Sequence, residues 1–260
     1  MIWDVHCHLS SADGRTPGEK MLFLLRHADR VGIEKLVVFM GYPFLQDPTG
    51  EQLRLQNDQV LQALAHHHDR AFGFVYVSPK HLKASLEEIE RCVKNGPMVG
   101  IKLWVARRCH LEDVEPILRR AAELKAVVYQ HTWFKTTGNF PGESTPLDLV
   151  ALAKSHPHLK ILCGHTGGNW EKGIRAIRSS SNLIAETGGF DPVYGMVDMA
   201  CRELSASRVV YGSDAPGRSF ASQIAKVTGA DIPEADKRRI LKENLRALLA
   251  PILLSKGIKP

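Results

Sequence analysis

The stretch LKILCGHTGGNW (Leu159–Trp170) shows the pattern that decides the fold: a short apolar run, Leu159–Cys163, is followed by glycines and then by a helical pattern. Eight such apolar, β-branched runs occur, at Ile2–His6, Lys35–Met40, Ala71–Val77, Met98–Leu103, Ala126–Gln130, Leu159–Cys163, Asn182–Thr187 and Arg208–Gly212. From Val5 in the first run to Tyr211 in the last, one unit takes about 29 residues. That length accommodates a strand, a helix and two short loops.

The stretches between and after these runs carry helical patterns. Those with the clearest apolar spacing or end signals are Gly18–Arg30, Leu82–Lys94, Asp113–Lys125, Thr145–Ser155, Asn169–Ser179, Ser219–Thr228 and Pro233–Leu254. Alternating strands and helices predict an α/β protein with a parallel sheet. Eight units in one uninterrupted chain predict a single (β/α)8 TIM barrel over residues 1–260, with an extra C-terminal helix. No G-x-G-x-x-G follows the first strand, which disfavours a dinucleotide-binding fold.

Composition narrows the class of protein. Hydrophobic residues make up 44% of the chain, and no apolar run approaches the length of a membrane span. The chain holds 34 Lys+Arg and 28 Asp+Glu, a net charge of +6, but the basic residues are spread out. A solvated basic surface or an anionic small substrate explains this charge better than nucleic acid does. Five scattered cysteines indicate reduced thiols and a cytoplasmic protein, and a homodimer stays open.

Residues able to bind a metal fall where the predicted strands end, which is the catalytic face of this kind of barrel. His6 and His8 are two positions apart and so share one face of the first strand. With His131 after the fifth strand and Asp214 after the eighth, they form a set of three nitrogens and one oxygen suited to one divalent ion. Zinc is the first choice, with manganese, iron or a second ion as alternatives. His165 ends the sixth strand, where it would serve as an acid or base.

Aromatic and charged residues near the same strand ends are candidates for substrate binding. Tyr42, Phe44, Trp104, Trp133 and Phe134 are expected as apolar walls, and Lys102, Arg107, Lys135 and Arg218 as anion binders, with ordinary packing or solvation as the alternative for each. Glu186 would either bind substrate or pair with a neighbouring base. The segment between Thr132 and Pro146 is long enough to form a lid.

Taken together, these motifs resemble the amidohydrolase superfamily, in particular the amidohydrolase-2 branch with the aminocarboxymuconate-semialdehyde decarboxylase relatives. The resemblance spans nearly the whole chain and rests on Asp4-x-His6-x-His8, His131, Gly164-His165-x-Gly167-Gly168, Tyr211-Gly212-Ser213-Asp214-Ala215-Pro216 and the closing helix Ile240–Leu249. It implies a single divalent metal on His6, His8, His131 and Asp214, with His165 as the catalytic acid or base.

Lys102 departs from that simple picture. It sits where binuclear members of the superfamily carry a carboxylated lysine between two metals. The alternative, which we favour, is a lysine whose charge balances Asp214, Glu186 or an anionic substrate. TatD-type metal-dependent deoxyribonucleases open with nearly the same motif, but their fourth strand supplies a glutamate where this chain has Val99-Gly100-Ile101-Lys102.

The chemistry of the ligand set favours hydrolysis. A divalent ion lowers the pKa of its bound water toward about 7, and Asp214 would accept the proton of that water. We therefore expect cleavage of an amide, ester or lactone bond in a small anionic molecule. The alternatives are non-oxidative decarboxylation of an aromatic or muconate-type acid, a TatD-like nuclease, and a catalytically silent binding barrel.

Overall fold

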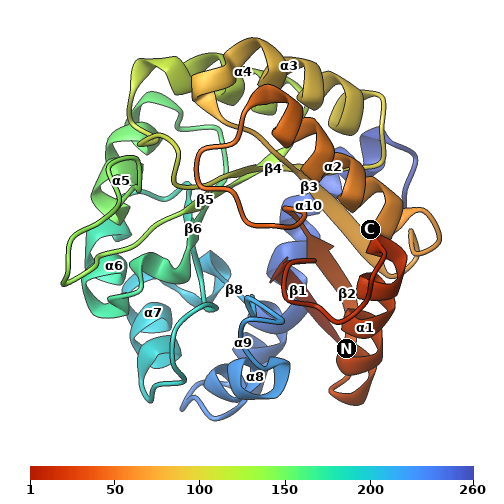
Figure 1. Ribbon diagram of the computed structural model, residues 1–260. Helices are drawn as coiled ribbons and strands as arrows, with labels where there is room; N and C mark the ends of the chain where they lie inside the picture. The colour runs from red at the N-terminus through yellow and green to blue at the C-terminus, as the bar shows by residue number, and fades with distance from the viewer.

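Eight parallel strands form one sheet that runs in sequence order from β1 to β8. A computed structural model describes all residues from 1 to 260. The strands are β1 (Ile2–Cys7), β2 (Ile33–Val38), β3 (Ala71–Tyr76), β4 (Gly100–Leu103), β5 (Val127–His131), β6 (Ile161–Gly164), β7 (Leu183–Glu186) and β8 (Val209–Val210). Figure 1 shows them around a common centre with the helices outside, which confirms the predicted (β/α)8 TIM barrel.

The barrel closes where β1 meets the segment after β8. The amide of His8 donates to the carbonyl of Ala215 (2.8 Å), and the amide of Asp214 donates to the carbonyl of His6 (2.8 Å). Cys7 and Ala215 also pair as a parallel bridge. Closure therefore brings the histidines at the end of β1 next to the carboxylate that follows β8.

Helices surround the strands. They are α1 (Pro17–Arg30), α2 (Gly50–Leu64), α3 (Leu82–Ile89), α4 (Glu115–Glu123), α5 (Pro146–Ser155), α6 (Trp170–Ile177), α7 (Met196–Leu204), α8 (Phe220–Thr228), α9 (Glu234–Arg238) and α10 (Asn244–Ser255). Thr16, Thr49 and Thr145 begin α1, α2 and α5, and each accepts a hydrogen bond from the amide three residues on. These reciprocal caps satisfy amides that a helix start leaves without partners.

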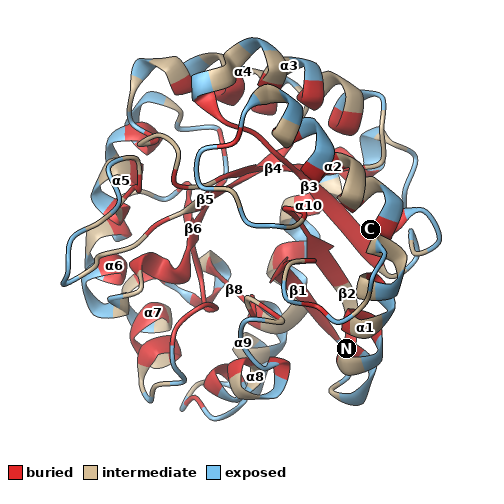
Figure 2. Cartoon of the chain, in the orientation of Figure 1, coloured by how far each residue is buried: buried red, intermediate tan, exposed pale blue.

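Alternation along the strands separates the apolar core from the functional face. Val5 and Cys7 belong to the buried core, whereas His6 and His8 line a pocket at the strand ends. Lys102 in β4 likewise lines the pocket, while both of its neighbours in the sequence join the core. Figure 2 shows buried residues along the strands and on the helices that cover them.

The helices differ from the sequence prediction at α2, at α7 and at the C-terminal helix. The sequence patterns named no helix at α2 or α7. In α2 the buried positions include the polar residues Gln56 and Asn57, which interrupt its apolar stripe. The C-terminal helix is present but divided into α9, a wider turn at Arg239–Glu243, and α10.

The five cysteines form no disulfide. None of the helices combines the length and apolar character that crossing a membrane requires.

Candidate metal centre

Two histidines and a carboxylate meet where the barrel closes. His6 Nε2 and His8 Nε2 are 2.9 Å apart, and each lies 3.2 Å from Asp214 Oδ1. In a tetrahedral site with metal–ligand bonds of about 2.0–2.1 Å, neighbouring ligand atoms are separated by ~3.3 Å. The three atoms therefore have nearly the spacing of one face of a site for a single divalent ion.

Hydrogen bonds at the outer nitrogens decide which nitrogen of each ring faces inward. His8 Nδ1 lies 3.1 Å from the carbonyl oxygen of Phe39, which only accepts, so His8 Nδ1 carries the proton. The hydroxyl of Tyr129 donates to Glu186 (2.9 Å) and therefore accepts from His6 Nδ1 (2.6 Å). The Nε2 atoms of His6 and His8 therefore face each other with their lone pairs. Two facing lone pairs repel, so the arrangement is stable when a proton or a metal ion lies between them.

A second pair of histidines repeats the arrangement. His165 Nδ1 donates to the carbonyl oxygen of Gly188 (3.1 Å), and His131 Nε2 donates to Glu143 Oε1 (3.0 Å). The remaining nitrogens, His131 Nδ1 and His165 Nε2, are 3.1 Å apart. Of the four ligands predicted from the sequence, three form the compact cluster, and His131 faces His165 instead.

Burial and the neighbouring charges set the protonation of these groups. Loss of hydration lowers the pKa of His8 and His131 to about 4 and holds the pKa of His165 well below its usual range. Burial also opposes the charged form of His6, but Asp214 and Glu186 together outweigh it and raise the pKa of His6. For Asp214, burial alone would raise the pKa, but His6 and His8 lower it well below its usual range. Asp214 and Glu186 therefore favour a proton on His6, and a divalent ion bound to these groups would replace that proton.

Acidification is expected to destabilise the metal-free protein between about pH 6.5 and pH 4. His8, His131 and His165 stay neutral in the fold, but each takes up a proton near its usual pKa of about 6.5 once the chain unfolds. The unfolded state then binds more protons, so the free energy of unfolding falls as the pH falls. Asp4 opposes this change, because burial raises its pKa to about 7, and so does His6, whose pKa is also raised. These two groups do not reverse the effect of three histidines.

Denaturant unfolding of the metal-free protein at several pH values across this window measures the effect. We expect the midpoint to move to lower denaturant concentration at each step down in pH. A midpoint that stays constant or rises would show that the histidines titrate normally in the folded protein.

Three residues other than glycine that line the pocket have an unusual backbone. Met40, His165 and Asp214 adopt left-handed conformations, with φ of 59°, 58° and 64°. For residues other than glycine such conformations cost on the order of 1–3 kcal/mol, and they persist where surrounding structure holds them. Both residues that the sequence indicates as catalytic, His165 and Asp214, are therefore among the strained positions of the chain.

The four histidines share one pocket of about 230 Å³ at the C-terminal ends of the strands. The pocket is lined by His6, His8, Met40, Phe44, Lys102, Trp104, His131, Trp133, His165, Gly189, Asp214 and Arg218. The rings of Phe44 and Trp104 lie 5.6 Å apart, and the ring of Trp133 stacks 6.1 Å from that of His131. The pocket thus combines a polar donor cluster with aromatic walls.

Lys102 brings a buried positive group to this pocket. Its side chain is 1% exposed, and its Nζ lies 3.9 Å from the ring centre of Tyr129 and 4.4 Å from that of Phe39. It forms no ion pair with a protein carboxylate. Burial lowers the pKa of Lys102 to about 7. An anionic group that enters the pocket would supply the missing counter-charge.

The other predicted substrate-binding residues divide into two groups. Trp104, Trp133 and Arg218 line the pocket. Arg107 does not: its guanidinium pairs with Asp113 (2.6 Å) in the loop after β4. Glu186 is fully buried behind the pocket, where it accepts from the amide of His165 (2.7 Å) and from Tyr129. Glu186 was predicted either to bind substrate or to pair with a neighbouring base. In the structure it contacts neighbouring residues of the site and does not line the pocket.

Sequence reasoning missed several residues of the site, among them Tyr129 and Glu143. Tyr129 had a readable signal, because it lies two positions before His131 in β5 and so shares its inward face. Glu143 had none, because it belongs to an irregular loop whose path no periodicity describes.

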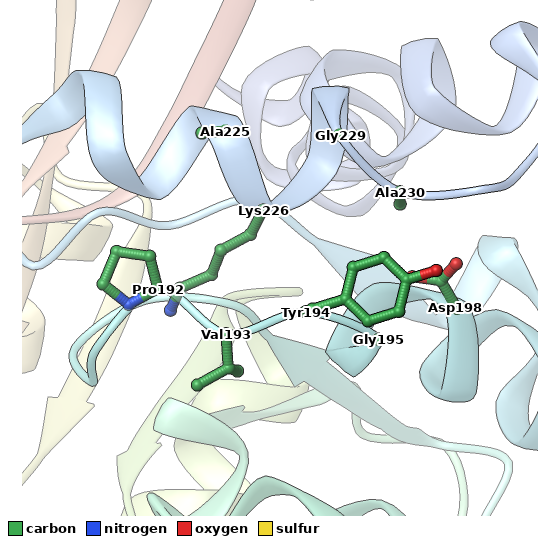
Figure 3. Close-up of a pocket in the computed structure, with 9 residues that line it drawn as sticks. All are labelled: Pro192, Val193, Tyr194, Gly195, Asp198, Ala225, Lys226, Gly229 and Ala230. Atoms are coloured by element: carbon green, nitrogen blue, oxygen red, sulfur yellow. The ribbon is translucent and has the colours of Figure 1, made fainter.

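A neighbouring pocket of about 270 Å³ lies between α8 and the loop after β7 (Figure 3). Its lysine, Lys226, donates to the carbonyl oxygens of Thr187 (2.8 Å) and Phe190 (3.2 Å). The ammonium group therefore holds the loop whose Gly188 carbonyl accepts from His165. Lys226 is thus linked to His165 through the backbone of this loop.

Comparison with known proteins agrees with this architecture. The profile of the amidohydrolase family matches residues 3–250. No curated protein matches the sequence. The chain is similar to the solved structure of 2,6-dihydroxybenzoate decarboxylase from Rhizobium, with 20% identity, a TM-score of 0.78 and coverage of 96% of this chain and 98% of that chain. It is also similar to dihydroxybenzoic acid decarboxylase from Polaromonas with bound manganese and the inhibitor 2-nitroresorcinol (19% identity, TM-score 0.75, coverage 96% of this chain and 97% of that chain). A third similar structure is 4-oxalomesaconate hydratase from Rhodopseudomonas palustris (16% identity, TM-score 0.73, coverage 99% of this chain and 98% of that chain).

At these identities the structural likeness establishes the fold alone. The family match covers almost the whole chain and includes every residue of the donor cluster. The chain therefore belongs to the amidohydrolase-2 branch of the amidohydrolase superfamily.

Proposed function

We propose that the protein is a metal-dependent carboxy-lyase that removes CO2 from a small aromatic or conjugated carboxylic acid. The observation that carries the proposal is the aromatic-walled pocket in which the His6–His8–Asp214 cluster faces the unpaired Lys102. At about 230 Å³ this pocket is smaller than the range of about 300–1,000 Å³ typical of drug-sized ligands. Dihydroxybenzoate decarboxylases of the same fold support this substrate class.

Decarboxylation exchanges a carbon–carbon bond for a carbon–hydrogen bond. The carboxylate leaves as CO2, and the electron pair that remains on carbon takes a proton. A zinc or manganese ion held by His6, His8 and Asp214 would draw electron density from the oxygens of the substrate. His131 lies outside that compact cluster but lines the same pocket, where it would be the fourth ligand. Aromatic walls around a bound substrate would exclude water and so favour neutral CO2 over the charged carboxylate.

His165 is the proposed carrier of the proton. Its Nδ1 is committed to the carbonyl of Gly188, so its Nε2 is the nitrogen free to take up and release a proton within the pocket. A substrate carboxylate in the pocket would raise the low pKa of His165 and favour a proton on Nε2. His165 would hand that proton to the carbon that loses CO2 and would then regain a proton from solvent.

Hydrolysis is the second candidate. The sequence alone ranked it first, and decarboxylases among the similar structures favour the reverse order. The position of Asp214 supports hydrolysis, because its Oδ1 lies 3.2 Å from the Nε2 atoms of both His6 and His8. A carboxylate at the donor cluster could accept a proton from water activated there.

One pair of assays distinguishes the candidates. Protein loaded with Zn²⁺ or Mn²⁺ is incubated with hydroxybenzoic acids and, separately, with small esters and lactones, while CO2 release and acid release are recorded. We expect CO2 from the acids and no opening of the esters or lactones. Acid release without CO2 would establish the hydrolase, and the absence of both from a metal-loaded protein would point to a binding barrel.

Replacing Lys102 by methionine tests the recognition of an anion. Hydrogen bonds to charged groups contribute about 1.5–3 kcal/mol, so we expect KM for the carboxylic acid to rise ~10–100-fold while kcat changes less. Steady-state kinetics measure both values. The control is Lys172→Met, which removes an exposed lysine from α6. An unchanged KM in the Lys102 variant would remove the anion-binding role.

A further inference from the structure

We propose that Glu143, in the loop between β5 and α5, is a positioning residue that keeps the metal-binding nitrogen of His131 free of its proton. The inference rests on the proposed function, because it takes His131 as a metal ligand. It adds a residue that lies twelve positions beyond His131 and touches no predicted ligand other than His131.

Both carboxylate oxygens of Glu143 are engaged. Oε1 accepts from His131 Nε2 at 3.0 Å, and Oε2 accepts from Lys135 Nζ (2.8 Å) and from the amide of Phe140 (3.1 Å). The side chain is 1% exposed, so water does not compete for these contacts. A buried carboxylate of this kind binds the N–H form of the facing histidine nitrogen.

The backbone fixes the carboxylate in place. The residue after Glu143 is Ser144, whose carbonyl accepts from the amide of Trp133 (2.9 Å) and whose hydroxyl accepts from the amide of Cys109 (3.0 Å). Thr132 and Ser144 also form a parallel bridge. The segment that the sequence suggested as a lid is therefore tied to the end of β5, and this tie holds Glu143 beside His131.

Glu143 matters because His131 has a competing partner. His131 Nδ1 lies 3.1 Å from His165 Nε2, so a proton on Nδ1 would be donated to His165. That tautomer would block the nitrogen of His131 that faces the pocket and would also occupy the nitrogen of His165 proposed to carry a proton. By accepting from Nε2, Glu143 favours the tautomer in which both inner nitrogens stay free.

The test is Glu143→Gln, which keeps the shape but removes the charge. Nitrogen-15 spectra of the histidine rings report the tautomer in the metal-free full-length protein, with His131→Asn used to assign the signal. Competition with a chelator gives the Kd for Zn²⁺ and for Mn²⁺. Glu171→Gln, an exposed glutamate on α6, is the matched control, and Glu143→Asp retains the charge if the glutamine variant does not fold.

We expect the proton of His131 to move at least partly from Nε2 to Nδ1 in Glu143→Gln. Metal affinity should fall ~10–100-fold, as is typical when a group that orients a metal ligand is lost. Glu143→Asp should recover part of that affinity, and Glu171→Gln should behave as wild type. An Nε2–H signal and a metal Kd that are both unchanged in Glu143→Gln would overturn the inference. Failure of the wild-type protein to bind metal would instead overturn the proposed function, since the tautomer is measured without metal.

Discussion

Replacing Asp214 by asparagine is expected to lower turnover by about a thousandfold or more and to weaken metal binding, with the fold retained. The substitution keeps the size of the side chain but removes the negative charge that both Nε2 atoms of His6 and His8 face at 3.2 Å. A neutral amide neither balances a divalent ion nor accepts a proton at the reacting centre. Turnover of the carboxylic acid and chelator competition measure the two losses.

Asp191→Asn is the matched control, because Asp191 is exposed in the loop after β7. It should leave both turnover and metal affinity unchanged. Wild-type turnover in the Asp214 variant would show that the cluster of His6, His8 and Asp214 is not the reaction centre.

Replacing His165 by glutamine is expected to lower kcat by about 10²–10⁴-fold, the usual contribution of a positioned acid or base. Metal affinity should change little, because His6, His8 and Asp214 form the compact donor cluster without His165. KM should also stay within a few-fold, since the amide still fills the space beside Gly189. Steady-state kinetics and metal titration of the same preparation separate these effects.

The control for this variant is His158→Gln, an exposed histidine between α5 and β6. A His165 variant that loses metal and turnover together would make His165 a ligand and not the proton carrier. Retention of full kcat would exclude it from the chemistry altogether.

The barrel and three residues of the donor cluster, His6, His8 and Asp214, were predictable because they depend on the spacing of residues along the sequence. The regular repeat of apolar runs indicates strands that alternate with helices, and this alternation is enough to predict the barrel. Two-residue spacing places His6 and His8 on one face of β1 wherever that strand lies. Parallel strands in sequence order then bring the end of the last strand, with Asp214, back to the first.

The remaining details depend on partners that spacing does not encode. The ring of His131 is oriented by Glu143, which lies in a loop without periodicity. Arg107 was expected at the pocket, but a nearer carboxylate, Asp113, binds it. Glu186 lies at the end of β7 as expected, yet its contacts with Tyr129 and His165 become visible only when the strands are packed together.

The metal content of purified protein, measured by plasma mass spectrometry after loading with Zn²⁺ or Mn²⁺ and dialysis, shows whether His6 and His8 hold a metal ion. We expect one divalent ion per chain in the wild-type protein and close to none in the double variant His6→Ala/His8→Ala. Equal metal content in the two proteins, or a wild-type protein that retains no ion, would contradict this expectation.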